Sequence, residues 1–165
     1  MSKLIKKYFK KKVDITNYDL WKDIDITEKE KHEFYDEHVN ELNDNTKVEW
    51  RCKYFLNQLS KYFRLYIITA RHEDAKDITI KWLDEHHIPY DKIYFNSGDK
   101  LDVCKKLKVK CMIDDSPWNI RKLNKYKVNC LIFNRPYNSM VKDTDYTTRV
   151  NSWEDIYFYL IGTKG

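Results

Sequence analysis

From residue 63 to the end of the chain, short apolar runs alternate with segments of helical periodicity, and this alternation limits the fold more than any other feature. The apolar runs are 65–69, 92–95, 110–113 and 129–133. The helical segments between and after them are 73–86, 100–107, 117–126 and 153–161. Strands that alternate with helices pair in parallel and are covered by helices on both faces. Near-continuous apolar runs suit such two-sided burial. The sequence therefore predicts an α/β domain on a parallel sheet of four strands.

The first 62 residues lack this alternation, and their pattern predicts helices without strands. Thr27 and Glu30 form a Thr-x-x-Glu capping box, in which each side chain satisfies a free backbone N–H group. A helix should therefore follow Thr27 and continue to about Leu42. A second helix is expected over 46–61. We divide the chain into a helical region, residues 1–62, and an α/β core, residues 63–165.

The composition excludes several classes of protein. Three glycines in 165 residues cannot supply the Gly-rich phosphate loop of a dinucleotide-binding protein or a P-loop NTPase. No apolar run approaches the roughly 20 residues of a membrane span, and the start of the chain lacks the apolar segment of a secretory signal. The four cysteines contain no Cys-x-x-Cys pair, which argues against zinc and favours buried, reduced thiols. We expect a cytoplasmic protein with no membrane partner.

The net charge of +5 comes from 31 basic and 26 acidic residues, and much of the excess lies in Lys3–Lys12 and 105–110. One interpretation is salt-sensitive binding of nucleic acid. We favour a solvated lysine-rich surface instead, because the aromatic residues are better explained by packing. We therefore expect Lys3–Lys12 to be exposed, so that its deletion would leave the melting temperature nearly unchanged.

Polar side chains follow successive strands of the predicted sheet. Thr69, Ala70 and Arg71 follow the first, Lys100 follows the second, and Asp114 and Asp115 end the third. Taken singly, each has an ordinary explanation, such as a helix cap for the aspartates or a surface position for the lysine. Ligands of an open parallel sheet bind beyond the carboxyl ends of its strands, where these side chains converge. Paired carboxylates suit Mg²⁺, and a lysine and a hydroxyl suit phosphoryl oxygens.

These residues also carry a resemblance to a known family. The matching segments are 66–71, 82–83, 88–91, Lys100, 113–117 and 135–138. Together they resemble the haloacid dehalogenase (HAD) superfamily and, within it, the cytosolic-type 5'(3')-deoxyribonucleotidases and their bacterial nucleotidase relatives. The Ile-Asp-Asp-Ser-Pro block after a Thr-Ala-Arg strand is the most specific part. The resemblance spans about residues 8–158.

The resemblance implies a fold, a reaction and roles for the site residues. The fold would be a HAD-like Rossmannoid three-layer parallel sheet with a small helical cap. Thr69, Ala70 and Arg71 would bind the phosphate of a nucleoside monophosphate or another small phosphate ester. Lys100 would neutralise that phosphate in catalysis. Asp114 would hold Mg²⁺, with Asp115 as a second metal ligand and catalytic group.

The same resemblance implies an Asp-x-Asp-x-Thr motif after a first, central strand, whose first Asp attacks phosphorus and whose second acts as acid and base. Residues 23–27 read Asp-Ile-Asp-Ile-Thr. The stretch before Asp23 is too polar for a buried strand, and Thr27 is better explained as a helix cap, so we do not place the nucleophile at Asp23 or Asp25. Nor can Lys3–Val13 be the strand, because burying so many lysines is too costly.

The nucleophile strand is therefore missing from this interpretation, and three explanations remain open. The sequence lacks an N-terminal segment, or the protein is a degenerate form that still binds phosphate or metal, or a second chain donates the strand, as in a homodimer. The functional hypothesis is a Mg²⁺-dependent HAD phosphatase of (deoxy)nucleoside monophosphates that is inactive in this form if the motif is truly absent. The alternative is a catalytically dead HAD-like protein that binds a nucleotide or a protein partner.

Overall fold

Parallel strands and covering helices make up most of the molecule. The computed structural model describes residues 2–22, 24–44 and 46–163. The helices are α1 (Ser2–Phe9), α2 (Glu28–Asp44), α3 (Cys52–Leu59), α4 (Lys76–Glu85), α5 (Leu101–Leu107), α6 (Pro117–Lys125) and α7 (Trp153–Gly162). The strands are β1 (Tyr66–Ile68), β2 (Lys92–Tyr94), β3 (Cys111–Asp114), β4 (Asn129–Phe133) and β5 (Thr147–Val150). Short 3₁₀ turns, η1 (Glu73–Ala75) and η2 (Pro136–Asn138), precede α4 and follow β4.

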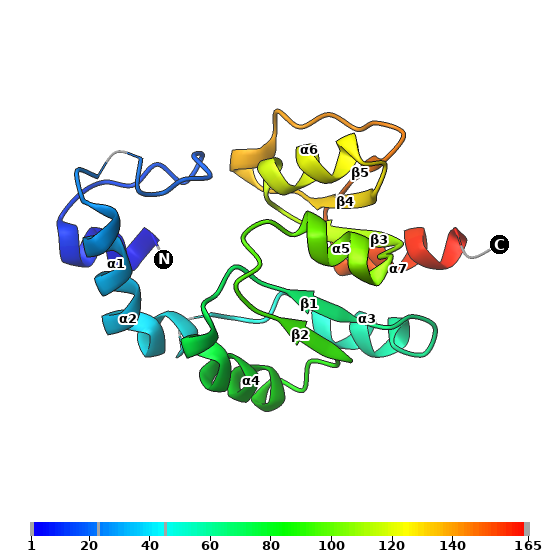
Figure 1. Ribbon diagram of the computed structural model, residues 1–165, viewed down its shortest axis with the longest axis horizontal. Helices are drawn as coiled ribbons and strands as arrows, with labels where there is room; N and C mark the ends of the chain where they lie inside the picture. Colours follow the sequence, from blue (N-terminus) through cyan, green and yellow to red (C-terminus); the bar gives the residue numbers. More distant parts are fainter. Residues whose placement is uncertain (1, 23, 45, 164–165) are drawn as a thin grey trace.

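The strands form two sheets rather than one, as Figure 1 shows. One sheet pairs β1 with β2, and the other has the order β3-β4-β5. Every pairing within them is parallel. This confirms the predicted α/β class and is consistent with a HAD-like Rossmannoid fold. The division into two sheets leaves one edge of β1 and one edge of β3 without a partner strand in the described residues.

The strand β5 was not among the four strands predicted from the sequence. Its residues, Thr-Thr-Arg-Val, lack the apolar run that is typical of a buried strand. It also follows a loop rather than a helix, so it does not fit the alternation of strands and helices. Thr147 and Val150 are nevertheless buried, because β5 pairs with the buried strand β4. Burial of β5 depends on the tertiary neighbour rather than on its own composition.

The capping box at the start of α2 is confirmed. Glu30 accepts hydrogen bonds from the Thr27 backbone N–H and hydroxyl, and the Glu30 N–H donates to Thr27 Oγ1 at 3.2 Å. The expected helix over 46–61 was too long, since α3 begins only at Cys52. Arg51 has φ 58°, a left-handed conformation that stops the helix from extending toward the N-terminus.

The N-terminal helices have a small core of their own. It consists of buried apolar side chains from α1, from the following loop and from α2: Leu4, Ile5, Trp21, Ile24 and Phe34. The expectation that all of Lys3–Lys12 is exposed is therefore wrong for Leu4 and Ile5. The lysines of α1 lie on the outer face of an amphipathic helix whose apolar face is buried.

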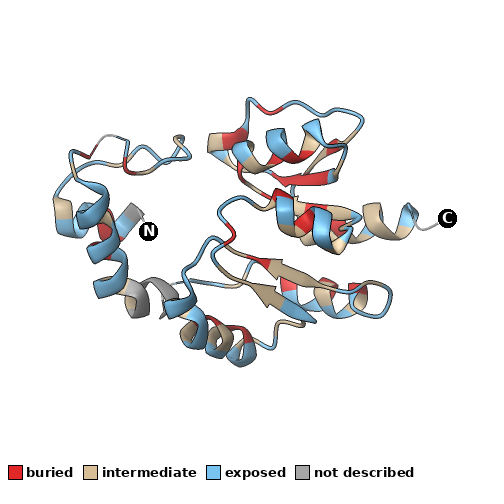
Figure 2. Ribbon diagram, viewed as in Figure 1, coloured by how far each residue is buried: buried red, intermediate tan, exposed pale blue. Residues whose placement is uncertain are grey.

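The α/β region has two further clusters, seen as buried ribbon in Figure 2. One lies beneath α5 and α6 and includes Ile120 and Ile132, together with Ile68 of β1. The other joins Leu59 of α3 to Leu131 and to Ile156 of α7. The division at residue 62 stays a prediction, since α3 packs on α7 although it precedes that residue. Among the described residues, no helix is long and apolar enough to cross a bilayer.

Candidate active site at the carboxyl edge of the strands

An ion pair between Lys100 and Asp114 lies at the carboxyl edge of the strands. Lys100 precedes α5, and its Nζ lies 2.7 Å from Oδ2 of Asp114, the last residue of β3. The Asp114 side chain is 3% exposed and that of Lys100 is 17% exposed. Because water screens such a pair only weakly, the two charges interact strongly. The structure thus brings together Lys100, which follows β2, and Asp114, which ends β3, the next strand along the sequence.

The carboxylate of Asp114 is held by three donors. Besides Lys100, the side-chain amide of Asn119 donates to Oδ2 at 3.0 Å, and the backbone N–H of Ser116 donates to Oδ1 at 2.8 Å. Ser116 is the N-cap of α6, and Pro117 follows at the first turn. Proline there has no N–H to leave unsatisfied. The Asp-Ser-Pro sequence therefore turns the chain from β3 into α6 and fixes Asp114 at the same time.

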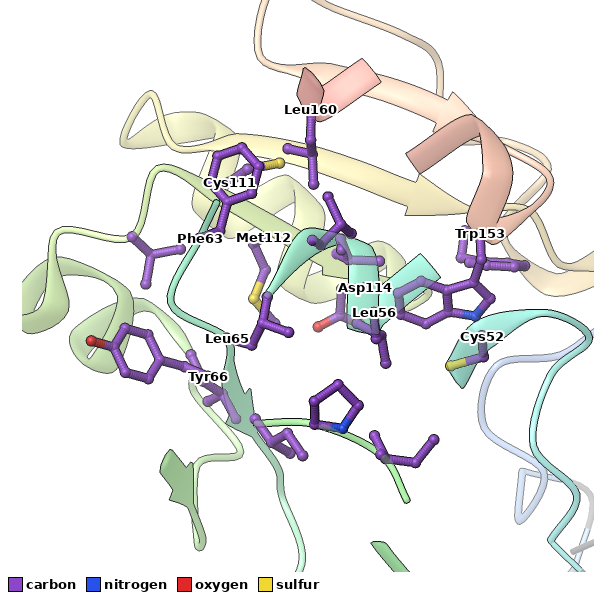
Figure 3. A pocket seen from close by; sticks show the side chains of 18 of the residues that line it. Cys52, Leu56, Phe63, Leu65, Tyr66, Cys111, Met112, Asp114, Trp153 and Leu160 are labelled. Carbon is purple, nitrogen blue, oxygen red and sulfur yellow. The ribbon is translucent and has the colours of Figure 1, made fainter. Parts of the chain in front are cut away.

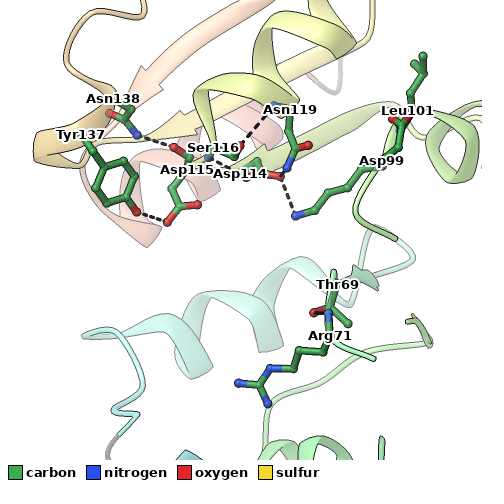
Figure 4. Close-up of polar contacts among 11 residues, drawn as sticks. Thr69, Arg71, Asp99, Leu101, Asp114, Asp115, Ser116, Asn119, Tyr137 and Asn138 are labelled. Atoms are coloured by element: carbon green, nitrogen blue, oxygen red, sulfur yellow. Dashed lines mark hydrogen bonds and ion pairs between the residues drawn. The ribbon is translucent and has the colours of Figure 1, made fainter. Parts of the chain in front are cut away.

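Asp115 faces a different set of partners (Figure 4). The hydroxyl of Tyr137 donates to Asp115 Oδ2 at 2.5 Å. Burial, and then this hydrogen bond to a carboxylate, raise the pKa of Tyr137 above its ordinary value of 10.0, so the phenol stays protonated. The side-chain amide of Asn138 donates to the Asp115 carbonyl at 2.9 Å. The loop after β4 thereby positions Asp115 from the opposite side to α6.

Thr69, Ala70 and Arg71 follow β1. Thr69 and Arg71 lie across from the two aspartates in Figure 4. The Thr69 hydroxyl accepts a hydrogen bond from the Arg71 N–H at 3.2 Å, which closes the turn. The Arg71 guanidinium donates to Thr79 of α4 at 2.9 Å. Ala70 is exposed. Arg71 is thus engaged with α4 on the β1–β2 side of the molecule, whereas Lys100 is engaged with Asp114.

A cavity of about 990 Å³ separates the two sheets and reaches the ion pair. Its lining includes Lys100, Asp114 and Asp115 together with apolar side chains of β1, β3 and α3. Leu56, Leu65 and Met112 gather in it (Figure 3). At its carboxyl edge, Arg135 forms an ion pair with Glu49, which connects the loop after β4 to the segment before α3.

The comparisons with known proteins identify the family of this chain. The family described as "5' nucleotidase, deoxy (Pyrimidine), cytosolic type C protein" matches residues 3–164. The chain belongs to this family. A nucleotidase of Clostridium acetobutylicum is 25% identical over 158 residues, which is 93% of this chain and 82% of that protein. The Bacillus subtilis protein named Putative nucleotidase YqfW is 30% identical over 142 residues, which is 85% of this chain and 73% of that protein.

The expected resemblance to HAD-type nucleotidases is therefore confirmed. A HAD-type nucleotidase of this family implies a divalent metal, typically Mg²⁺. Mg²⁺ is usually held by one or two carboxylates, with water and substrate phosphate completing its shell. Asp114 and Asp115 meet that requirement, because the three donors on Asp114 leave about one of its four lone-pair positions free. The described residues contain no group of three or more His, Cys, Asp and Glu side chains that could hold a metal.

Asp25, the described aspartate of the Asp-Ile-Asp-Ile-Thr string, is not part of the cavity lining described above. Asp23 falls outside the described residues, and Asp25 is exposed in the loop before α2. Thr27, which ends the string, caps α2 as expected. The structure gives Thr27 a structural role and shows no contact of Asp25 with Lys100 or Asp114.

Three residues that hold the site together were not predicted as site residues. Asn119 contacts Asp114, while Tyr137 and Asn138 contact Asp115. Asn119 could have been found from sequence, because it stands three residues after the N-cap Ser116, on the turn of α6 that faces back toward β3. Tyr137 and Asn138 lie 22 and 23 residues after Asp115, beyond α6 and β4. Both belong to the segment 135–138 that carries the family resemblance, at the carboxyl end of β4, and that placement is the signal that could have found them.

Proposed function

We propose that this chain is a Mg²⁺-dependent phosphatase of (deoxy)nucleoside monophosphates, acting at the edge where β1, β2 and β3 end. The observation that carries the proposal is the buried Lys100–Asp114 pair beside Asp115. A phosphate monoester is a dianion near neutral pH, so its site needs cations and firmly held ligands for a metal. Membership of the nucleotidase family supports the choice of a nucleotide as the ester.

Each residue has a proposed role. Lys100 neutralises charge on the phosphoryl oxygens, and Thr69 with the backbone at Ala70 orients them. Arg71 would bind the phosphate only after releasing Thr79. Asp114 and Asp115 would hold Mg²⁺, which when bound supplies charge neutralisation to the phosphoryl group. Asn119 and Tyr137 keep the two carboxylates in place.

The roles above do not include the carboxylate that attacks the phosphorus atom. The carboxylates that line the cavity in the described residues are Glu49, Asp114 and Asp115. Glu49 is paired with Arg135, and Asp114 is paired with Lys100. Asp115, whose partner Tyr137 is a neutral donor, is the carboxylate without a cation partner among these three. Direct attack would therefore fall to Asp115 or to a carboxylate from outside the cavity lining.

The test is Mg²⁺-dependent phosphate release from a panel of deoxynucleoside and ribonucleoside monophosphates. We expect Lys100→Met and Asp114→Asn to lower kcat/KM by about 10²-fold or more, as loss of charged groups at a phosphoryl site does. Matched controls are Lys106→Met on the exposed side of α5 and Asp84→Asn on α4, which should keep full activity. Equal activity in Asp114→Asn and Asp84→Asn would contradict the site assignment.

A second candidate is a protein that binds the nucleotide without hydrolysing it. The observation that favours it is the pairing of two of the three cavity carboxylates with cations. Calorimetric titration with a nucleoside monophosphate and Mg²⁺ separates the two functions. Binding that is lost in Lys100→Met, with no phosphate release by the parent chain, would support the binding protein and contradict the phosphatase.

A further inference from the structure

The excess positive charge of this chain is concentrated in one stretch. Residues 99–127 contain nine basic and four acidic residues, a net charge of +5 that equals the net charge of the whole chain. The rest of the chain therefore balances 22 basic against 22 acidic residues. All of the nine basic residues except Lys100 are exposed, whereas Asp114 and Asp115 lie in the candidate active site. The excess charge thus lies on the outer surface around α5 and α6.

The helix α6 has an apolar inner face and a basic outer face. Ile120 and Leu123 are buried, and they attach the helix to the core beneath it. Four exposed residues follow the spacing i, i+3, i+4 and i+7, which places them along one side of a helix: Trp118, Arg121, Lys122 and Lys125. We call these four residues the outer stripe of α6. At 1.5 Å per residue, the stripe is about 10 Å long.

Trp118 is the least expected member of the outer stripe. It is 71% exposed, although burial of so large an apolar side chain is favourable. Within the described residues its indole has no hydrogen bond and no ring contact. The packing explanation that we gave for the aromatic residues therefore does not hold for Trp118. An exposed ring beside cations is the arrangement on which proteins stack the bases of single-stranded nucleic acid.

Two cations of the outer stripe are available to an anion. Lys122 pairs with Asp99, in the loop before α5. Arg121 and Lys125 form no ion pair within the part of the chain that the structure describes. A surface hollow between α6 and the loop before α5 is lined by Trp118, by these two cations and by the Lys122–Asp99 pair. The free cations and the exposed indole thus border the same hollow, where they favour a negatively charged ligand with a flat ring.

The far end of the stripe continues onto α5, which packs against α6 (Figure 1). Lys105 of α5 places its Nζ 3.8 Å from the centre of the Tyr126 ring, and Tyr126 is 53% exposed just after α6. A second aromatic ring with a cation therefore lies eight residues after Trp118, or about 12 Å along the helix. This length corresponds to about three or four nucleotides at about 3.4 Å each.

We propose that the outer face of α6, from Trp118 to Tyr126, binds single-stranded nucleic acid. Trp118 stacks on a base, and Arg121, Lys125 and Lys105 contact phosphates along the strand. An acidic peptide would pair with the cations but offers no base to the indole. An anionic membrane would need an apolar helix face to insert, whereas the outer stripe has one aromatic residue among cations. The proposal does not depend on the phosphatase activity, so the two can fail separately.

The experiment is fluorescence anisotropy of a labelled twelve-nucleotide oligothymidylate titrated with the full chain. The probe carries no terminal phosphate and the buffer contains EDTA, so neither the candidate active site nor a metal contributes to binding. Trp118→Ala should weaken binding at least fivefold, as loss of one stacked base does. Trp118→Phe should restore most of the affinity. The control is Trp50→Ala, which removes a tryptophan that is 74% exposed outside α5 and α6 and should leave binding unchanged.

The dependence of binding on salt tests the phosphate contacts. Each contact with a single strand contributes about −0.7 to the slope of log K against log salt concentration. The double variant Arg121→Ala with Lys125→Ala should therefore make the slope shallower by about 1.4, whereas Trp118→Ala should leave the slope unchanged. Lys29→Ala with Lys81→Ala, on α2 and α4, removes the same charge and should change neither slope nor affinity.

Three results would overturn the proposal. One is the absence of binding at about 50 mM salt, where contacts with phosphate are strong. Another is an equal loss of affinity in the two double variants, because the binding would then reflect net charge alone. The third is displacement of the oligonucleotide by polyglutamate or by phosphatidylserine vesicles at equal charge concentration, with Trp118→Ala weakening their binding to the same extent. That result would assign the face to an acidic protein or a membrane.

Discussion

Asn138 shows how one side chain can fix a functional loop. It is fully buried, and its amide donates to the carbonyls of Phe133 at 2.8 Å and of Asp115 at 2.9 Å. Its Oδ1 accepts from the Arg135 N–H at 3.0 Å and from the Arg149 guanidinium at 2.9 Å. The residue therefore connects the end of β4, the site loop and β5.

Asn138→Ala should lower the free energy of unfolding by roughly 2–4 kcal/mol, because it leaves the buried Phe133 carbonyl, and the partly buried Asp115 carbonyl and Arg135 N–H, without partners. Urea unfolding followed by circular dichroism measures this. Ser139→Ala, at the exposed neighbouring position, is the control and should lie within about 0.5 kcal/mol of the parent. A loss of less than about 1 kcal/mol would show that water replaces these bonds.

Tyr137 gives a dependence on pH with a definite sign. Burial and the hydrogen bond to Asp115 raise its pKa in the folded protein above 10.0. Folding thus favours the protonated phenol, so this contribution to stability is complete below pH 10 and is lost as the pH rises above 10. The difference in unfolding free energy between the parent and Tyr137→Phe should therefore shrink between pH 9 and 11.

Urea midpoints for the parent, Tyr137→Phe and the exposed control Tyr126→Phe, measured at several pH values, check this. The control removes the general effect of lysine titration, which all three proteins share. A parent-to-Tyr137→Phe difference that stays constant from pH 9 to 11 would contradict a phenol held protonated by Asp115.

At the scale of single elements, the chain places non-glycine residues where glycine is usual. Lys127, in the turn between α6 and β4, has φ 59°. A side chain in this left-handed region costs roughly 1 kcal/mol. Lys127→Gly should relieve this strain, but it also gives the unfolded chain more conformational freedom. The net result should be an increase of about 0.5 kcal/mol in the free energy of unfolding.

The matched substitution is Lys125→Gly, two residues earlier in the last turn of α6. There the backbone is helical, and glycine should lower the unfolding free energy by about 0.5–1 kcal/mol. Thermal unfolding of the two variants should therefore shift the melting temperature in opposite directions. A shift in the same direction for both would mean that the Lys127 side chain makes a stabilising contact.

Local chemistry explains which elements the sequence could predict. Apolar runs such as Asn129–Phe133 and capping signals such as Thr27 with Glu30 act within a few residues, and both are confirmed. The convergence of Lys100 and Asp114 followed from the rule for parallel sheets. The strand β5 and the contacts of Tyr137 depend on residues distant in sequence, so no local pattern could predict them.

At the scale of the whole molecule, the described residues form three separate hydrophobic clusters, and within them the N-terminal cluster contains no residue from the α/β region. Between α1–α2 and the rest, the aromatic contacts of the described residues include Tyr18 with Tyr137, whose ring centroids lie 5.5 Å apart, and His32 with His72 at 5.8 Å. Helix α2 also packs against α4. No hydrophobic cluster of the described residues spans the two regions, however, and this favours local unfolding of the N-terminal helices.

Ile5→Ala tests this independence, because Ile5 is fully buried in the N-terminal cluster. Loss of its packing should cost that cluster about 2–4 kcal/mol. Hydrogen exchange should accelerate in α1 and α2 and stay unchanged in β3 and β4. Lys6→Ala, on the exposed face of α1, is the control. Equal acceleration in β4 would show that the clusters unfold as one cooperative unit. Confined acceleration would make the N-terminal helices a separately mobile element beside the Asp115–Tyr137 contact, able to move while the site stays folded.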